Sequence, residues 1–347
     1  MKDKTCPPHD LTRIVNILAF TLVAAYLLSL GASASWIADL FQHFMHQYFI
    51  GSVILAPIML YLKRPRTSII LFITLCLSFY EIYSSSEHIQ PANKTYSNTL
   101  KIVHYNRHYN LNDHRIMTEW LIKENPDIFV IQETGETHSK AIESLRGLYP
   151  YQIHEPSKGA FGFVLASKYE ILSSETHQNK QYAINNISVH AQIKLSDNNI
   201  ISIYASHPPP PVSALLQEQR NETLKTIAKE IQQNQTRNII FIGDWNITPY
   251  SPYFKAFLKE TGLKNQQHSF YTPPTWPSTF PLPIFQIPID HILHKGDLHL
   301  INKRNGPHMG SDHFPIIAEF ILPEQTPHKE KQWTHLQYDL ETSKPSL

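Results

Sequence analysis

Cysteine is nearly absent from this chain of 347 residues, which contains only Cys6 and Cys76. Because no cysteine follows position 76, the rest of the sequence has no means of forming an internal disulfide or a thiolate metal site. Any metal bound there must have oxygen and nitrogen ligands. The scarcity of cysteine fits an oxidising and a reducing compartment equally well.

An excess of charge of one sign is also absent. Residues 1–86 contain six Lys or Arg and four Asp or Glu, which gives a net charge of +2. The remainder contains 24 Lys or Arg and 25 Asp or Glu, which gives a net charge of −1. A domain that binds nucleic acid chiefly through phosphate charge is expected to be clearly basic. The composition therefore does not favour nonspecific DNA binding, unless a local basic patch supplies it.

Three long apolar runs, almost free of charge, lie in the first 86 residues and predict transmembrane helices at about 14–33, 44–62 and 68–83. About 20 apolar residues are needed to cross the hydrocarbon core of a bilayer. The third run is shorter and has Glu81 near its end. A secretory signal peptide is the alternative for the first run, but further apolar runs follow it instead of a soluble domain.

Basic residues gather at one end of these predicted helices. Lys2, Lys4 and Arg13 precede the first and a basic turn at 63–66 separates the second from the third, whereas residues 31–47 lack Lys and Arg. The positive-inside rule places both basic clusters in the cytoplasm. Three crossings then put the rest of the chain on the periplasmic side of a bacterial inner membrane, and two would leave it in the cytoplasm. The expected partners of this segment are membrane lipids, and no obligate protein partner is inferred.

The remaining sequence predicts a linker at 87–99, a mixed α/β domain at 100–322 and a polar tail at 323–347. Predicted strands are 101–106, 127–133, 162–167, 187–195, 200–207, 238–244, 290–294 and 315–321, and predicted helices are 113–124, 213–233 and 252–261. Residues 265–288, rich in proline and aromatics, predict a functional loop that either walls a substrate site or covers a sheet edge.

Polar side chains suited to metal binding or proton transfer stand where several of these strands end. In chain order they are Glu133, His207, Asp244, Asn246, Asp290, Asp312 and His313. The end of a strand holds a side chain rigidly at one edge of a sheet, as metal-assisted displacement at phosphorus requires. The sequence therefore predicts a catalytic site at this edge.

The segments around these residues resemble, in order, the signature motifs of the endonuclease/exonuclease/phosphatase family. They are Gln132-Glu133, Gly243-Asp244-Trp245-Asn246, Asp290-His291-Ile292 and Ser311-Asp312-His313-Phe314-Pro315, and Asn106 matches the family's first Asn. The resemblance spans about 100–322 and implies two packed β-sheets covered by helices on both outer faces. The expected fold is thus a four-layer αββα, DNase I-like sandwich preceded by transmembrane helices.

The resemblance also implies a divalent metal. Glu133 would be the principal ligand of Mg²⁺ or Mn²⁺, with Asn106 and Asp312 beside it, and hard oxygen ligands suit such ions. Several relatives carry Asn or Asp two residues after the first Asn, whereas this chain has His108. The metal shell near Asn106 is therefore the least typical part of the pattern.

The resemblance assigns proton transfer and phosphate binding to the other residues. Asp244 would orient and activate the attacking water, and Asn246 would hydrogen-bond a phosphate oxygen. His313, oriented by Asp290, would be either the general base or a phosphate-binding histidine. His207 would stabilise charge on the phosphoryl oxygens or protonate the leaving group.

These expectations together describe a membrane-anchored, metal-dependent phosphoesterase. Its phosphodiester substrate would be a lipid headgroup, a small molecule or nucleic acid. The alternative is a membrane-tethered binding module that kept the fold and lost turnover. Most of the 20 histidines, among them His104 and His291, are expected to be structural or on the surface.

Overall fold

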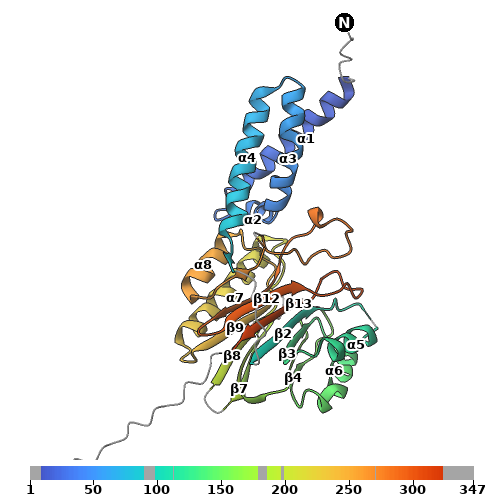
Figure 1. The fold of residues 1–347 in the computed structure, drawn as a ribbon, viewed down its shortest axis with the longest axis vertical. Coiled ribbons are helices and arrows are strands. Elements are labelled where there is room, and N and C mark those ends of the chain that lie inside the picture. The colour runs from blue at the N-terminus through green and yellow to red at the C-terminus, as the bar shows by residue number, and fades with distance from the viewer. Residues whose placement is uncertain are drawn as a thin grey trace, which may run out of the picture.

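A helical bundle stands on a sandwich of two β-sheets in the computed structural model (Figure 1). The structure describes residues 9–89, 98–111, 113–178, 186–196, 199–269 and 271–322. Most of the predicted linker and the whole of the predicted tail lie outside the described residues, as do Lys2, Lys4 and Phe270.

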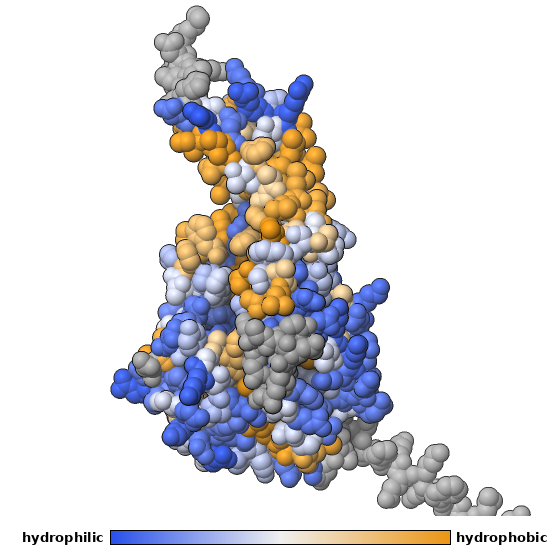
Figure 2. Space-filling model, turned by 180° about the vertical axis from the view of Figure 1, so that it is seen from behind, coloured by the Kyte–Doolittle hydropathy of each residue, from blue (hydrophilic) through white to orange (hydrophobic). Residues whose placement is uncertain are grey.

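The bundle contains four helices, α1 (His9–Ser29), α2 (Trp36–Gln42), α3 (Met45–Tyr61) and α4 (Pro65–Ser84). The long helices α1, α3 and α4 run side by side, with the α3–α4 turn at the end far from the sandwich (Figure 1). Ala19, Ala56, Met59 and Leu71 are buried where they meet. Hydrophobic residues cover most of the outer surface of the bundle, and hydrophilic residues lie at its far end (Figure 2).

Among the described residues, α1 and α4 are each long and apolar enough to cross a membrane, and α2 with α3 would make a third span as a pair bent by 60°. Helices α3 and α4 coincide closely with the predicted spans 44–62 and 68–83. The first span was placed too late, because α1 begins at His9 and ends at Ser29, where residues 30–34 turn the chain toward α2.

The short helix α2, which the sequence did not predict, lies at the base of the bundle against the sandwich (Figure 1). Its Asp39 is fully buried and pairs with Arg220 at 2.6 Å, and Ser251 Oγ donates to the same carboxylate at 3.0 Å. Gln42 Nε2 donates to the Tyr250 carbonyl at 3.0 Å. Polar contacts therefore join the bundle to the sandwich, whereas the sequence had suggested two units separated by a linker.

Each sheet of the sandwich is covered by helices on its outer face. The strand orders are β12-β13-β2-β3-β5-β4 and β11-β9-β8-β7-β6. The strands are β2 (Thr99–Asn106), β3 (Ile128–Gln132), β4 (Tyr151–Glu155), β5 (Phe163–Ser167), β6 (Glu170–Gln178), β7 (Ile187–Ser196), β8 (Asn199–Ser206), β9 (Asn238–Asp244), β11 (Asp290–Lys295), β12 (His299–Asn305) and β13 (Ile316–Ile321). The covering helices are α5 (Arg115–Glu124), α6 (Glu136–Glu143), α7 (Ala214–Gln233) and α8 (Pro252–Thr261), with the short 3₁₀ helices η1 (Ser144–Gly147) and η2 (Pro283–Phe285).

Three apolar layers hold the sandwich together. Residues such as Ile102 and Ile203 fill the space between the sheets. Phe129 lies in the layer beneath α5 and α6, and Phe241 lies in the layer beneath α7 and α8. Strands buried on both faces have near-continuous apolar runs, which is why the sequence revealed them. The arrangement is the αββα sandwich expected from the resemblance.

Elements missing from the prediction lie mainly at sheet edges. Strands β4, β6 and β12 are all edge strands. An edge strand exposes part of its side chains, so its apolar pattern is weak. The predicted linker also differs at its start, because β1 (Glu87–His88) pairs in parallel with β10 (Gln266–Gln267).

Candidate active site

A pocket of about 490 Å³ lies where α2 meets the sandwich. All eight residues singled out from the sequence come together here. Six of them line the pocket: Glu133, His207, Asp244, Asn246, Asp312 and His313. The other two stand directly behind, Asn106 bonded to Glu133 and Asp290 bonded to His313.

Asn106 and Glu133 occupy the ends of the neighbouring parallel strands β2 and β3. The Asn106 amide nitrogen donates to Glu133 Oε1 at 2.9 Å and to Asp244 Oδ2 at 3.0 Å. The Tyr109 backbone N–H donates to Glu133 Oε2 at 2.9 Å. The backbone of Glu133 has a φ of 61°, an uncommon value for a residue with a side chain. Strand pairing and these bonds hold the carboxylate toward the pocket at some cost in backbone strain.

Asp244 ends β9 and is fixed from the opposite sheet. Gln132 Oε1 accepts from the Asp244 backbone N–H at 2.8 Å, while Gln132 Nε2 donates to the Ser206 carbonyl at 2.9 Å. The preceding Gly243 has a φ of +147°, and a Cβ there would lie 2.2 Å from the Ser206 oxygen. Glycine is therefore required for the close approach that aims Asp244 into the pocket.

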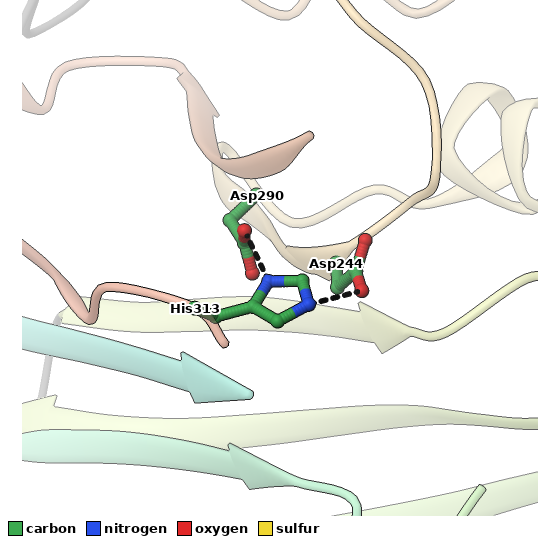
Figure 3. Close-up of side chains that lie close together, drawn as sticks. All are labelled: Asp244, Asp290 and His313. Atoms are coloured by element: carbon green, nitrogen blue, oxygen red, sulfur yellow. Dashed lines mark hydrogen bonds and ion pairs between the residues drawn. The ribbon is translucent and has the colours of Figure 1, made fainter. Parts of the chain in front are cut away.

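A carboxylate clamped between two histidines forms the back of the site. Asp290 Oδ2 bonds His313 Nδ1 at 2.8 Å, and Asp290 Oδ1 bonds His104 Nε2 at 2.8 Å. Figure 3 shows the His313 ring between Asp290 and Asp244, with the Nε2–Asp244 Oδ2 distance at 3.7 Å. The sequence assigned His104 a structural role. Its position two residues before Asn106 on β2 puts both on the same face of the strand, and that was the available signal.

The electrostatics of this group favour charged side chains despite burial. Burial lowers the pKa of His313, but the carboxylates of Asp290 and Asp244 outweigh it and raise the pKa to about 10. Burial likewise lowers the pKa of His207, and the bond and charge of Asp244, 3.4 Å away, raise it above its ordinary value. Burial and the charge of Asp290 raise the pKa of Asp244, but the two histidines outweigh them and hold it below its usual range.

Asp312 faces the pocket from the segment before β13. The indole nitrogen of Trp276 donates to Asp312 Oδ2 at 3.0 Å, and Ser311 Oγ donates to the Asn106 carbonyl at 2.8 Å. The second bond holds Asp312 and Asn106 at the same edge of the sheet. Asp312 and Glu133 therefore both present carboxylate oxygens to one pocket.

Two groups of side chains have the composition of a metal site. Ligand atoms of Asp244, Asp290 and His313 lie within 4.8 Å of one another. Both oxygens of Asp290 are taken by histidines, however, so this trio is better described as an acid–histidine pair next to a second carboxylate. Glu133 and Asp312 offer the hard oxygens that Mg²⁺ and Mn²⁺ prefer.

Asn106 as a metal ligand stays a prediction. Its amide oxygen accepts from the His108 backbone N–H at 3.1 Å, and its amide nitrogen faces the two carboxylates. In this arrangement it orients Glu133 and Asp244 by donating to both.

Asn246 is connected to the helical bundle through Arg220. The Asn246 side chain donates to the Pro208 carbonyl at 3.0 Å, and its own backbone carbonyl accepts from Arg220 at 3.3 Å. Arg220 is the partner of Asp39 on α2. The sequence gave no role to Asp39 or Arg220, since 181 positions separate them and neither belongs to a motif.

The walls of the pocket are apolar and come from four segments. Leu40 and Phe44 belong to the helical bundle, Ala160 and Phe161 precede β5, and Pro210, Pro211 and Val212 follow β8. Trp276 and Ile287 belong to the proline- and aromatic-rich segment, and Ile289 comes just after it. That segment therefore walls the pocket, one of the two roles expected for it. Its Phe280, Leu282 and Phe285 are exposed instead.

Solved structures with similar folds align with nearly the whole sandwich. The catalytic domain of human nocturnin is 15% identical, with a TM-score of 0.51, over 67% of this chain and 96% of that domain. D. rerio TDP2 in complex with a single-strand DNA product is 17% identical, with a TM-score of 0.53, over 64% of this chain and 98% of TDP2. A mannosyl-6-phosphatase of Bacteroides thetaiotaomicron is 16% identical, with a TM-score of 0.51, over 64% of this chain and all of that enzyme. At such low identity the likeness shows the fold alone.

The family assignment comes from the sequence itself. No protein with a curated description matches the chain. The model of the endonuclease/exonuclease/phosphatase family matches residues 98–313, which is more than half of the chain and includes all eight residues singled out from the sequence. The chain therefore belongs to the endonuclease/exonuclease/phosphatase family, whose members are hydrolases of phosphoester bonds.

Proposed function

We propose that this protein is a membrane-anchored, divalent-metal-dependent phosphodiesterase that hydrolyses its substrate by in-line attack of water. The observation that carries the proposal is the arrangement of the pocket floor. There the Glu133 and Asp312 carboxylates face the same space as Asp244, His207 and His313. A purely structural polar cluster would gain nothing from gathering three carboxylates and two histidines around an open pocket, with four of these five side chains buried.

Glu133 and Asp312 would hold Mg²⁺ or Mn²⁺, with Asn106 beside them. When bound, the ion supplies positive charge that neutralises the phosphoryl oxygens as the bond to the leaving group breaks. The donor set fits this group because it is made of oxygens and is fixed by Tyr109, Trp276 and the strand ends.

Asp244 is placed to orient the attacking water. Its Oδ2 accepts from Asn106 and faces both histidines, and its Oδ1 accepts from the Asn246 backbone N–H at 3.0 Å. These contacts keep the carboxylate charged and fixed in direction. It can therefore hold a water molecule by hydrogen bonding and receive a proton from it as the water attacks phosphorus.

The two histidines are placed to act on the phosphoryl group. Both ring nitrogens of His313 face carboxylate oxygens, at 2.8 Å to Asp290 and 3.7 Å to Asp244. Two acceptors favour a doubly protonated ring, so phosphate binding suits His313 better than proton abstraction. His207, paired with Asp244 on the other side, is left to donate a proton to the leaving oxygen.

The helical bundle supports a membrane location. We propose that α1, α3 and α4 cross the inner membrane of a bacterium, with the basic turn at 63–66 in the cytoplasm and the sandwich in the periplasm. A reporter that is active only in the periplasm, fused after Ser84, tests this topology. An active fusion supports three crossings, and a silent one moves the sandwich to the cytoplasm.

The catalytic proposal is tested with the full-length chain in detergent, because removing the anchor would leave Arg220 without Asp39. Hydrolysis of bis-p-nitrophenyl phosphate is measured with Mg²⁺, with Mn²⁺ and with EDTA. We expect turnover with a metal and none with EDTA. Glu133→Gln should lose turnover, and the control Glu119→Gln, at an exposed position of α5, should keep it. A folded protein that turns over no diester or monoester with any metal would favour the tethered binding module instead.

A further inference from the structure

The membrane anchor contributes directly to the pocket above the catalytic floor. Leu40 and Phe44, at α2 and just after it, line the same pocket as Glu133 and His313. The anchor residue His43 also lines it and bonds Thr248 Oγ1 at 3.0 Å. A simple tether would have no reason to form part of the substrate pocket.

This wall is held in place by buried polar contacts, so it is a fixed part of the site. Asp39, one residue before Leu40, is fully buried against Arg220, and Gln217 Nε2 donates to the same carboxylate at 3.1 Å. A buried ion pair with further hydrogen bonds has a defined geometry. Leu40 and Phe44 are therefore set at fixed positions relative to the catalytic floor.

Apolar side chains are exposed around the base of the bundle, at the level of the pocket. Gln47 on α3 donates to the Ile284 and Gln286 carbonyls, at 2.7 Å and 3.1 Å, and so holds the loop around η2 against the anchor. The exposed apolar residues of this loop and of the pocket rim are Phe44, Val212, Phe280, Leu282 and Phe285, each at least 39% exposed. A cluster of this kind marks a surface that contacts a membrane or another apolar partner.

Basic side chains are missing where a nucleic-acid backbone would need them. Among the described residues that line the pocket, none is Lys or Arg. Binding along a nucleic-acid strand rests on several such contacts to successive phosphates. The pocket instead offers one phosphate-sized polar floor beneath apolar walls.

We propose that the substrate is an amphiphilic phosphodiester of the bilayer, whose phosphate reaches the floor while its apolar chain lies against Leu40, Phe44 and Val212. This inference rests on the proposed phosphodiesterase function and adds the substrate class. In the reaction the oxygen of water bonds to phosphorus and one ester P–O bond breaks. The leaving oxygen departs with the bonding electrons and gains a proton, so a phosphomonoester and an alcohol are formed.

The test uses the full-length protein in detergent and a series of methyl, butyl and octyl p-nitrophenyl phosphates, each below its micelle-forming concentration. Only the apolar chain varies, because the reacting phosphodiester and the leaving group stay the same. A fully buried methylene contributes roughly fourfold, so kcat/KM is expected to rise at least about tenfold from methyl to octyl. A flat series with measurable turnover would overturn the substrate class and leave the proposed function standing.

Variants locate the effect in the pocket. Leu40→Ser and Phe44→Ser are expected to reduce the octyl-to-methyl ratio of kcat/KM by about tenfold. Ile37→Ser is the matched control, because Ile37 is an exposed apolar residue of the same helix that does not line the pocket. An equal reduction in Ile37→Ser would mean that α2 merely holds the detergent or membrane surface, and would overturn the inference.

A binding measurement tests the proposed ligand class independently of the proposed phosphodiesterase activity. Calorimetric titration compares methylphosphonate with octylphosphonate on the wild-type chain and on Phe44→Ser. At least about tenfold tighter binding of octylphosphonate, lost in the variant, supports the amphiphilic ligand class even if no substrate turns over. Equal affinities would overturn it.

Discussion

The floor and the wall of the pocket differ in origin and in chemistry. The floor is polar, comes from strand ends and the loops next to them, and lies among hydrogen bonds that link the two sheets. The wall is apolar and comes partly from the helical bundle. Under the two proposals, the sandwich determines which bond is broken and the helical bundle helps determine which molecules reach it.

The largest expected effect concerns the floor. Asp244→Asn keeps the shape of the side chain but removes the charge that orients water and pairs with His207 and His313. We expect kcat to fall by about 10³-fold, within the range for loss of a general acid or base. Steady-state kinetics on bis-p-nitrophenyl phosphate measure this, on a variant shown to be folded. Activity above about a tenth of wild type would remove Asp244 from the mechanism.

The next effect concerns the buried ion pair between Asp39 of the helical bundle and Arg220 of the sandwich. Asp39→Asn leaves Arg220 buried without a counter-charge, and breaking a buried pair costs about 3–5 kcal/mol of unfolding free energy. Denaturant unfolding in detergent measures it. The exposed pair of Arg237 and Asp297 is the control, because Asp297→Asn should cost less than about 1 kcal/mol. An equal loss of unfolding free energy in the two variants would mean that this pair does not hold the helical bundle against the sandwich.

A smaller effect tests the back of the floor. His104→Gln removes one of the two histidines that fix Asp290, and the hydrogen bond to a charged group contributes about 1.5–3 kcal/mol. If that orientation is needed in the transition state, kcat should fall about ten- to a hundredfold with little change in KM. His154→Gln, on the edge strand β4, is the control. An unchanged kcat would reduce His104 to the structural role that the sequence suggested.

The smallest effect concerns the stability of the layer beneath the floor as pH falls. Burial lowers the pKa of His291 to about 3, and its Nε2–H donates to the Ile247 carbonyl while Nδ1 has no partner. Between pH about 6.5 and about 3 the imidazole is protonated in the unfolded state and neutral in the folded state. The unfolded state therefore binds more protons, and the free energy of unfolding decreases as the pH is lowered. The loss from this residue is about 2 kcal/mol at pH 5.

Unfolding at pH 7 and pH 5 measures this loss. The variant His291→Phe, which fits between Trp245 and Phe254, should show a smaller difference between the two pH values. An unchanged difference would mean that other groups cause the acid sensitivity.

The sequence by itself determined the sandwich and the floor of the pocket. Central strands buried on both faces leave continuous apolar runs, and polar residues that interrupt such runs, such as Glu133 and Asp244, are visible one by one. Their order along the chain matched a known family, and the family model and the two packed sheets confirm that assignment. The three apolar runs before residue 87 likewise indicated the helices of the bundle.

Only the tertiary structure decided how the two parts meet. The pairing of Asp39 with Arg220 and of His104 with Asp290 joins residues 181 and 186 positions apart, and nothing in either local sequence specifies the partner. The apolar wall has the same physical cause. In the sequence, Leu40 and Phe44 belong to the predicted membrane anchor. Only folding brings them next to the polar floor, because the neighbours of a side chain are set by the packing of the whole chain.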